Sequence, residues 1–188
     1  MSTDVGGVLL DHARGAIASH FGVPADPAGE HPALAGPGAT FVTLNLDDQL
    51  RGCIGSLEAH RPLREDVRLN AIGAAFRDPR FTPLTLREFE RTRIEVSLLS
   101  PLEPVTFTSE TELLALLRPG VDGLVFRYGH HRSTFLPQVW ETLPEPRDFL
   151  EQLKRKAGLP FGFWAAEVQA WRYTVAKWVE SDLEETLP

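Results

Sequence analysis

The stretch Thr-Arg-Ile-Glu-Val-Ser-Leu-Leu at Thr92–Leu99 decides the class of fold, because apolar and polar side chains alternate along it. In an extended chain, Ile94, Val96 and Leu98 point to one face and the polar side chains between them point to the other. This pattern is typical of an antiparallel strand with one face against a core and the other face against water. The stretch therefore predicts a half-buried antiparallel sheet.

The segments on either side of this strand mix helices and strands. Before it, we predict a helix over residues 5–21, a loop rich in proline and glycine over 22–39, a hairpin of strands 41–46 and 50–56, and a helix over 62–76. After it, we predict a short helix from 110, a hairpin of strands 123–128 and 132–136, a helix over 146–157 and one long strand over 168–179. Because this order lacks a regular βαβ rhythm, it favours an α+β fold with antiparallel sheets flanked by helices.

Length and composition limit the number of domains and the kinds of partner that this chain can have. Its 188 residues suffice for one domain, or for two small subdomains that share a core. Its net charge of −7 counts against general binding to nucleic-acid phosphates. The N-terminal residues show no secretory signal, and no apolar run reaches the ~20 residues of a membrane span. We therefore expect a cytoplasmic protein without a membrane partner.

Cys53 is the only cysteine, which excludes an internal disulfide and a cysteine zinc cage. The dinucleotide fingerprint, the phosphate loop, the serine-hydrolase elbow and the zinc-protease helix motif are all absent. The six histidines are scattered, and no two lie four residues apart on a helix as metal ligands would. We therefore predict neither a metal site nor a cofactor.

The most informative stretch is Leu-Arg-Gly-Cys-Ile-Gly at residues 50–55. Arg51 and Cys53 lie two apart in a predicted strand and so share a face. An arginine rarely lies in a dry core without a partner, so this face is predicted to be a cleft or a wet surface. The guanidinium would favour the thiolate of Cys53, as a nucleophile requires. Gly52 and Gly55 would let a ligand approach the backbone closely.

The alternative for this stretch is structural. Cys53 would then be a small buried hydrophobe, and Arg51 would pair with a carboxylate. The sequence does not identify the general base that a cysteine nucleophile needs. Cys53 is thus a candidate catalytic thiolate, and the pattern does not decide between chemistry and packing.

Five other residues complete the predicted ligand-binding set. Asp78 and Arg80 lie in a turn, where they would hold an anion or pair with each other to fix the turn. Glu95 lies on the polar face of its strand, which a solvated sheet face explains equally well. Thr134 and Gln138 lie where a strand runs into the start of a helix, and they present hydrogen-bonding groups there.

Residues 50–55 resemble the signature hexapeptide of the AMMECR-one domain family. The resemblance continues in chain order over nearly the whole chain, in blocks at residues 62–67, 74–84, 94–101, 119–124, 134–141, 156–159 and 172–173. One departure is Ser133, where the family pattern has glycine. The proline-rich segment 22–39 matches no motif.

The resemblance implies a single domain over residues 1–188 with two lobes, a larger one from both chain ends and a smaller inserted one. The signature strand would border a cleft between them. In bacteria and archaea such domains are associated with a Memo-type dioxygenase-like protein and a radical-SAM protein, in the AmmeMemoRadiSam system. The resemblance implies no activity, because family members are often described as of unknown function.

Two hypotheses about function therefore stay open. In the first, the chain is an enzyme or an enzyme component that acts on a small anionic molecule, with Cys53 as thiolate and Arg51 or Arg80 holding the anion. In the second, it is a non-catalytic binding or adaptor module for a partner protein or a nucleic acid. The first fails if Cys53 is fully buried with no cleft within reach of its side chain; fold alone decides neither.

Overall fold

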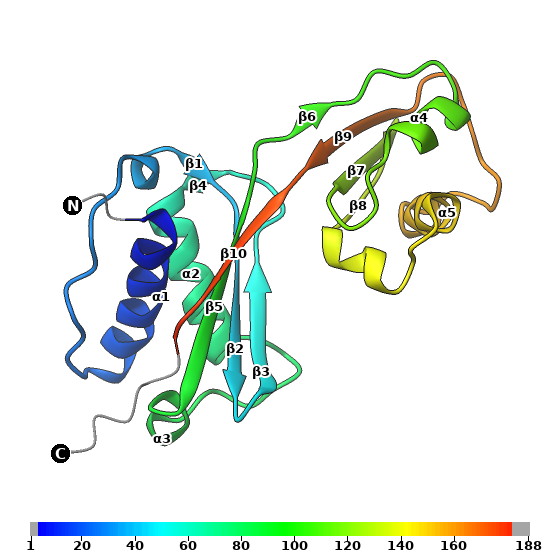
Figure 1. The fold of residues 1–188 in the computed structure, drawn as a ribbon. Coiled ribbons are helices and arrows are strands. Elements are labelled where there is room, and N and C mark those ends of the chain that lie inside the picture. The colour runs from blue at the N-terminus through cyan, green and yellow to red at the C-terminus, as the bar shows by residue number, and fades with distance from the viewer. Residues whose placement is uncertain (1–3, 182–188) are drawn as a thin grey trace. The chain divides into compact units, whose positions relative to one another are not determined.

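The computed structural model describes residues 4–181, which form two compact units (Figure 1). Unit 1 combines both ends of the chain, Met1–Leu99 and Ala176–Pro188, and unit 2 is the inserted segment Ser100–Val175. This confirms the α+β fold with a larger lobe from both chain ends and a smaller inserted lobe. The cleft between the lobes stays a prediction.

Unit 1 is built on an antiparallel sheet with the strand order β10-β5-β2-β3 (Figure 1). The predicted strand Thr92–Leu99 is β5, and it pairs along its whole length with β2. Two long helices, α1 and α2, pack together on the sheet face that carries the fully buried Val42, Leu44, Ile94 and Val96. The elements of this unit are α1 (Val5–Phe21), η1 (Pro32–Ala35), β1 (Pro37–Gly38), β2 (Thr40–Leu46), β3 (Gln49–Gly55), β4 (Arg61–Pro62), α2 (Leu63–Phe76), α3 (Leu86–Phe89), β5 (Thr92–Leu99) and β10 (Val175–Val179).

The proline-rich segment after α1 is not a loop throughout. Gly22, with φ of 68°, ends α1 in the left-handed conformation that favours glycine. The second half of the segment contains η1 and β1, and β1 pairs with β4 just before α2. Leu34 of η1 is 1% exposed and belongs to the core of unit 1. This half is therefore anchored, whereas residues 23–31 form neither helix nor strand.

Unit 2 has its own antiparallel sheet, in the order β6-β9-β7-β8, and its own core. Trp140 stacks on the fully buried Phe149, with ring centroids 3.8 Å apart. Lys154 is fully buried, and its ammonium pairs with Glu110 at 2.8 Å and with Glu151. The elements are β6 (Glu103–Pro104), α4 (Glu110–Leu116), β7 (Gly123–Tyr128), β8 (His131–Phe135), η2 (Pro137–Glu141), α5 (Pro146–Lys156) and β9 (Gln169–Tyr173).

The prediction of one long strand over residues 168–179 is wrong. The structure has two strands there, β9 in the sheet of unit 2 and β10 in the sheet of unit 1, with Thr174 between them. The residues on both sides of Thr174 favour extended backbone, so the local pattern runs on without a break. Tertiary pairing, which the local pattern does not contain, decides where the chain changes sheet.

Candidate functional site

Cys53 lies on β3, an edge strand of the unit 1 sheet, and its side chain is partly exposed. Thr43 lies directly opposite on β2, and its hydroxyl donates a hydrogen bond to the sulfur of Cys53 at 3.3 Å. Cys53 is therefore not fully buried, and a cleft within reach of its side chain stays a prediction.

A β-bulge lies beside the cysteine. Leu44 pairs with Gly52 and Asn45 pairs with Leu50, so Arg51 has no partner on β2. Simple alternation, on which the sequence argument placed Arg51 and Cys53 on one face, does not hold across a bulge. The guanidinium of Arg51 reaches Glu88 of α3, with Nε 3.0 Å from Oε1 and Nη2 3.1 Å from Oε2.

The Glu88 carboxylate accepts hydrogen bonds from two directions, from Arg51 of β3 and from Thr85 at the start of α3. Its hydrogen bond from Arg51, together with one from the backbone N–H of Thr85, lowers the pKa of its carboxyl to about 2. The Arg51 side chain is only 11% exposed, and among residues 4–181 its Nη1 is buried without a hydrogen-bond partner. Glu88 thus holds the Arg51 guanidinium in place, while the Nη1 nitrogen of that guanidinium has no hydrogen-bond partner in this part of the chain.

Asp78 and Arg80 form what we call the Asp78–Arg80 clip on the edge strand. Asp78 is 4% exposed and accepts hydrogen bonds from Nε and Nη2 of Arg80 at 3.0 and 2.7 Å and from the backbone N–H of Cys53 at 2.9 Å. Nη2 of Arg80 also donates to the carbonyl of Cys53 at 3.4 Å. The clip therefore occupies the outward N–H and C=O of Cys53, which would otherwise be open for another strand.

The two partners of the clip fix each other's charge. The Arg80 guanidinium holds the pKa of the Asp78 carboxyl far below its usual range, against the opposing effect of burial. The same hydrogen bonds raise the pKa of Arg80. Phe81 lies near both arginines, with its ring centroid 5.5 Å from Cζ of Arg80 and 5.8 Å from Cζ of Arg51. The structure thus brings Arg51, Arg80, Asp78 and Cys53 into one neighbourhood.

Glu95 extends this neighbourhood across the sheet. It lies on β5 opposite Thr43, which in turn lies opposite Cys53. Lys177 of β10 pairs with the Glu95 carboxylate at 2.9 Å. Four strands therefore contribute a lateral row of a thiol, a hydroxyl, a carboxylate and an ammonium group.

The two glycines of the signature lie against protein atoms. A Cβ at Gly52 would lie 2.1 Å from the carbonyl oxygen of Ala74 in α2. A Cβ at Gly55 would lie 2.3 Å from the ring of Phe41. The missing side chains let α2 and Phe41 approach β3, and the predicted contact of these glycines with a ligand stays a prediction.

Thr134 and Gln138 belong to unit 2. The hydroxyl of Thr134 lies 3.0 Å from that of Tyr173, which also donates to the carbonyl of Phe135 at 3.1 Å. Burial raises the pKa of Tyr173. Gln138 lies in η2 and is exposed. Their place in a site with Cys53 stays a prediction.

Thr43, Phe81, Glu88 and Lys177 were not predicted. The Thr85-to-Glu88 spacing is a capping-box signature and marks Glu88 as fixed, which the structure bears out. Thr43 and Lys177 become neighbours of the site only through strand register, which the sequence does not show. Within residues 4–181, no three His, Cys, Asp or Glu side chains gather as metal ligands would, and no helix is long and apolar enough to cross a membrane.

Comparison with known proteins identifies a family that this chain matches. The AMMECR1 family model matches residues 10–178. Protein MJ0810 of Methanocaldococcus jannaschii is 41% identical over 141 residues, which cover 71% of this chain and 68% of the relative. A protein of Methanothermobacter thermautotrophicus is 36% identical over 185 residues, covering 92% and 93% of the two chains.

A solved structure has the same fold. The crystal structure of the uncharacterized protein PH0010 from Pyrococcus horikoshii is 32% identical in sequence, with a TM-score of 0.75. The similarity covers 93% of this chain and 91% of that one. Together with the matching family model, this similarity shows that the chain belongs to the AMMECR1 family.

Proposed function

We propose that this chain is an enzyme or enzyme component that binds a small anionic molecule beside Cys53, with the thiolate of Cys53 in contact with it. The observation that carries the proposal is how Cys53 is held. Thr43 donates to its sulfur, Asp78 accepts from its N–H and Arg80 donates to its carbonyl, yet the side chain stays partly exposed. The two backbone contacts also close the edge of β3, but a hydroxyl group that donates to the sulfur of a partly exposed cysteine provides the positioning that a reactive group needs.

The charges around Cys53 fit an anion. Asp78 engages only Nε and Nη2 of Arg80, whose side chain is 55% exposed, so this guanidinium can still meet a ligand. Guanidinium groups bind carboxylates and phosphates in fork geometry. Arg80 is therefore the proposed anion holder, with Arg51 beside it. In the AmmeMemoRadiSam system, the Memo-type protein and the radical-SAM protein are the proposed partners.

Alkylation of the single cysteine tests the proposal. We expect iodoacetamide to label Cys53 in the native protein, and inorganic pyrophosphate to slow labelling at constant ionic strength. Arg80→Gln should remove this protection and reduce the labelling rate at pH 7 by up to about tenfold, because a guanidinium near a thiol increases its reactivity. The rates are measured by mass spectrometry of the intact chain between pH 6 and 9.

Arg91→Gln is the matched control. The Arg91 side chain is also 55% exposed and pairs with a carboxylate, Asp47, so the variant changes net charge equally. It should label and be protected like the wild type. If both variants behave alike, the effect is one of overall charge; if native Cys53 does not label or pyrophosphate does not protect it, the proposal fails.

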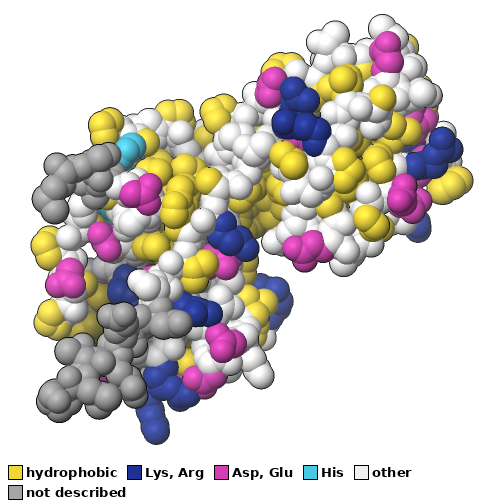
Figure 2. Space-filling view, viewed as in Figure 1, with side chains coloured by type: hydrophobic (Ala, Val, Ile, Leu, Met, Phe, Trp, Pro, Cys, Tyr) yellow, Lys and Arg dark blue, Asp and Glu magenta, His cyan; other side chains and the backbone are white. Residues whose placement is uncertain are grey.

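One observation favours the second candidate, a non-catalytic binding or adaptor module for a partner protein. Both arginines are paired with carboxylates, Arg51 with Glu88 and Arg80 with Asp78, so these four groups carry no net charge. Figure 2 shows acidic and basic side chains interspersed on the visible face of each unit rather than a continuous basic surface, which counts against a nucleic acid as the partner. Slow labelling without anion protection would support this candidate.

A further inference from the structure

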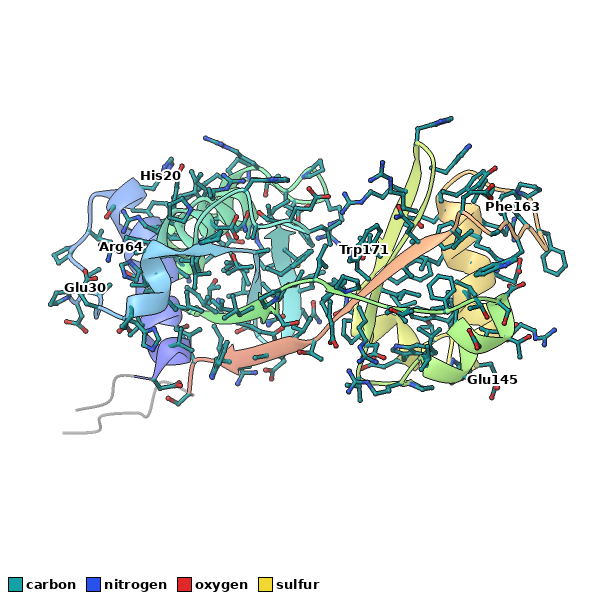
Figure 3. The ribbon with its side chains drawn as sticks, turned by 90° about the horizontal axis from the view of Figure 1, so that it is seen from above. His20, Glu30, Arg64, Glu145, Phe163 and Trp171 are labelled. Atoms are coloured by element: carbon teal, nitrogen blue, oxygen red, sulfur yellow. The ribbon has the colours of Figure 1, made fainter. Side chains whose placement is uncertain are left out.

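Residues 23–31, which we call the strap, cross unit 1 between α1 and η1 without regular structure. Two polar contacts hold their second half. Gly29 accepts a hydrogen bond from His12 of α1 at 3.2 Å, and Glu30 pairs with Arg64 of α2, beside which it lies in Figure 3. The Glu30 and Arg64 side chains are 72% and 45% exposed, so their ion pair adds little. The contact to His12 is the buried one.

The neutral ring of His12 is held in one tautomer. It is 5% exposed, and its Nε2 faces a carbonyl oxygen, which only accepts, so Nε2 carries the proton. Within residues 4–181, Nδ1 is buried without a hydrogen-bond partner. Protonation of the ring at Nδ1 would therefore place a positive charge and an unpaired hydrogen-bond donor in a buried site.

The charges that face His12 add to this cost. Arg64 and Arg68 of α2 disfavour a protonated ring, whereas the hydrogen bond to Gly29 and the charge of Glu30, both in the strap, favour it. Burial is the largest effect, and it lowers the pKa of His12 below its ordinary value of 6.5. A group with a lowered pKa stabilises the closed arrangement fully above its ordinary value. That stability is lost as the pH falls from about 6.5 through the lowered pKa.

A pocket that is partly open to solvent lies beside the first half of the strap. It measures about 360 Å³ and is lined by Asp11, Arg14, Gly15 and Ala18 of α1, by Pro24–Asp26 of the strap, and by Phe89. One of its walls is therefore the strap itself. Displacement of the strap would open this wall while leaving the core contacts of α1 unchanged.

We propose that the strap is a pH-operated wall of this pocket, released from α1 when His12 takes up a proton, so that acidification widens the pocket. The protonated ring needs water at Nδ1. The helices α1 and α2 share the apolar core of unit 1, whereas residues 23–31 form neither helix nor strand. Val23 packs against that core and its N–H donates to the carbonyl of Ala18 at 3.1 Å, so we expect only the part of the strap after Val23 to move away. Release of that part hydrates the charge without disturbing the packed helices.

Nuclear magnetic resonance of the full chain tests this. Between pH 7.5 and 5.0 the backbone order parameters of Ala25, Asp26, Ala28, Gly29 and Glu30 should fall from about 0.85 to below about 0.6. The midpoint should lie below about 6.5 and coincide with the titration of the His12 ring, followed by its carbon-bound protons. Far-ultraviolet circular dichroism should show unit 1 still folded at pH 5.0.

Three variants distinguish release of the strap through His12 from effects of the other histidines near it. His12→Gln keeps an N–H donor for Gly29 but does not titrate, so its strap should stay ordered at pH 5.0. His20→Gln, on the same helix, should release the strap as the wild type does. His31 is the histidine of the strap itself, and its Nδ1 accepts from the N–H of Ala33; His31→Asn keeps an acceptor and should not change the transition.

Two results would overturn the proposal. One is a wild-type strap that keeps its order while the His12 ring titrates, which needs no variant. The other is a pH transition that survives in His12→Gln or disappears in His31→Asn.

Discussion

Replacing Asp66 with alanine is expected to lower the free energy of unfolding by about 3–5 kcal/mol, a large part of the stability of a typical domain. Asp66 is fully buried in the first turn of α2. Its Oδ2 accepts from the N–H and the hydroxyl of Thr40, both at 2.8 Å, and from Asn70 at 3.0 Å. Its Oδ1 accepts from the hydroxyl of Ser56 at 2.6 Å and pairs with Arg61 at 3.2 Å.

The size of this effect follows from what the alanine leaves behind. The N–H and hydroxyl of Thr40, itself 0% exposed, would lose their acceptor in a place that water does not reach. Buried donors without partners cost more than the average hydrogen bond is worth. Asp66→Asn should be nearly as harmful, because its amide group offers one oxygen where donors approach both carboxylate oxygens.

Urea denaturation followed by circular dichroism measures the change. The control is Glu65→Ala, because Glu65 is exposed and lies in the same first turn, so both substitutions remove the same favourable charge from the helix N-terminus. Glu65→Ala should change the free energy of unfolding by no more than about 1 kcal/mol. A loss below 1 kcal/mol in Asp66→Ala would contradict this account of how α2 is joined to β2.

The spacing of α2 contained a signal for this network. Leu63, Asp66, Val67 and Asn70 follow the spacing of one helix face, so a carboxylate and an amide lie on the same face as two buried apolar residues. A polar pair on a core-facing stripe indicates a buried hydrogen-bond network. The partners of that network, Thr40 and Ser56, belong to other segments, and no local pattern names them.

The predicted elements and the predicted contacts differ in how well they match the structure. Residues 92–99 were predicted as a strand and form β5 with the same bounds, because alternation is a local property. The bulge at Arg51 and the pairing of Glu95 with Lys177 depend on register and on strands far apart in the sequence. The candidate site was therefore located by its signature, whereas its geometry came from the tertiary fold.

Gly52→Ala is expected to lower the free energy of unfolding by at least about 3 kcal/mol, the upper end for overpacked positions. The new Cβ would lie 2.1 Å from the carbonyl oxygen and 3.0 Å from the carbonyl carbon of Ala74. These are backbone atoms inside α2, so no side chain can rotate away. Either β3 or α2 must move as a whole, and close packing resists that movement.

Gly15→Ala is expected to raise the free energy of unfolding, and it serves as the control. Gly15 lies in α1, and a Cβ there would meet nothing within 4 Å. Alanine should therefore stabilise the chain by about 0.5–1 kcal/mol, since it loses less backbone entropy on folding. Urea denaturation of both variants gives the comparison, and an equal change in the two would contradict the close approach at Gly52.

The same variant separates two roles for Gly52. Displacement of β3 would move the N–H of Cys53 away from Asp78, its partner at 2.9 Å, and so disturb the cysteine as well as the fold. Packing predicts that lost stability and altered labelling of Cys53 occur together. A Gly52→Ala chain as stable as the wild type, but no longer protected by pyrophosphate, would instead show that this glycine is there for the ligand.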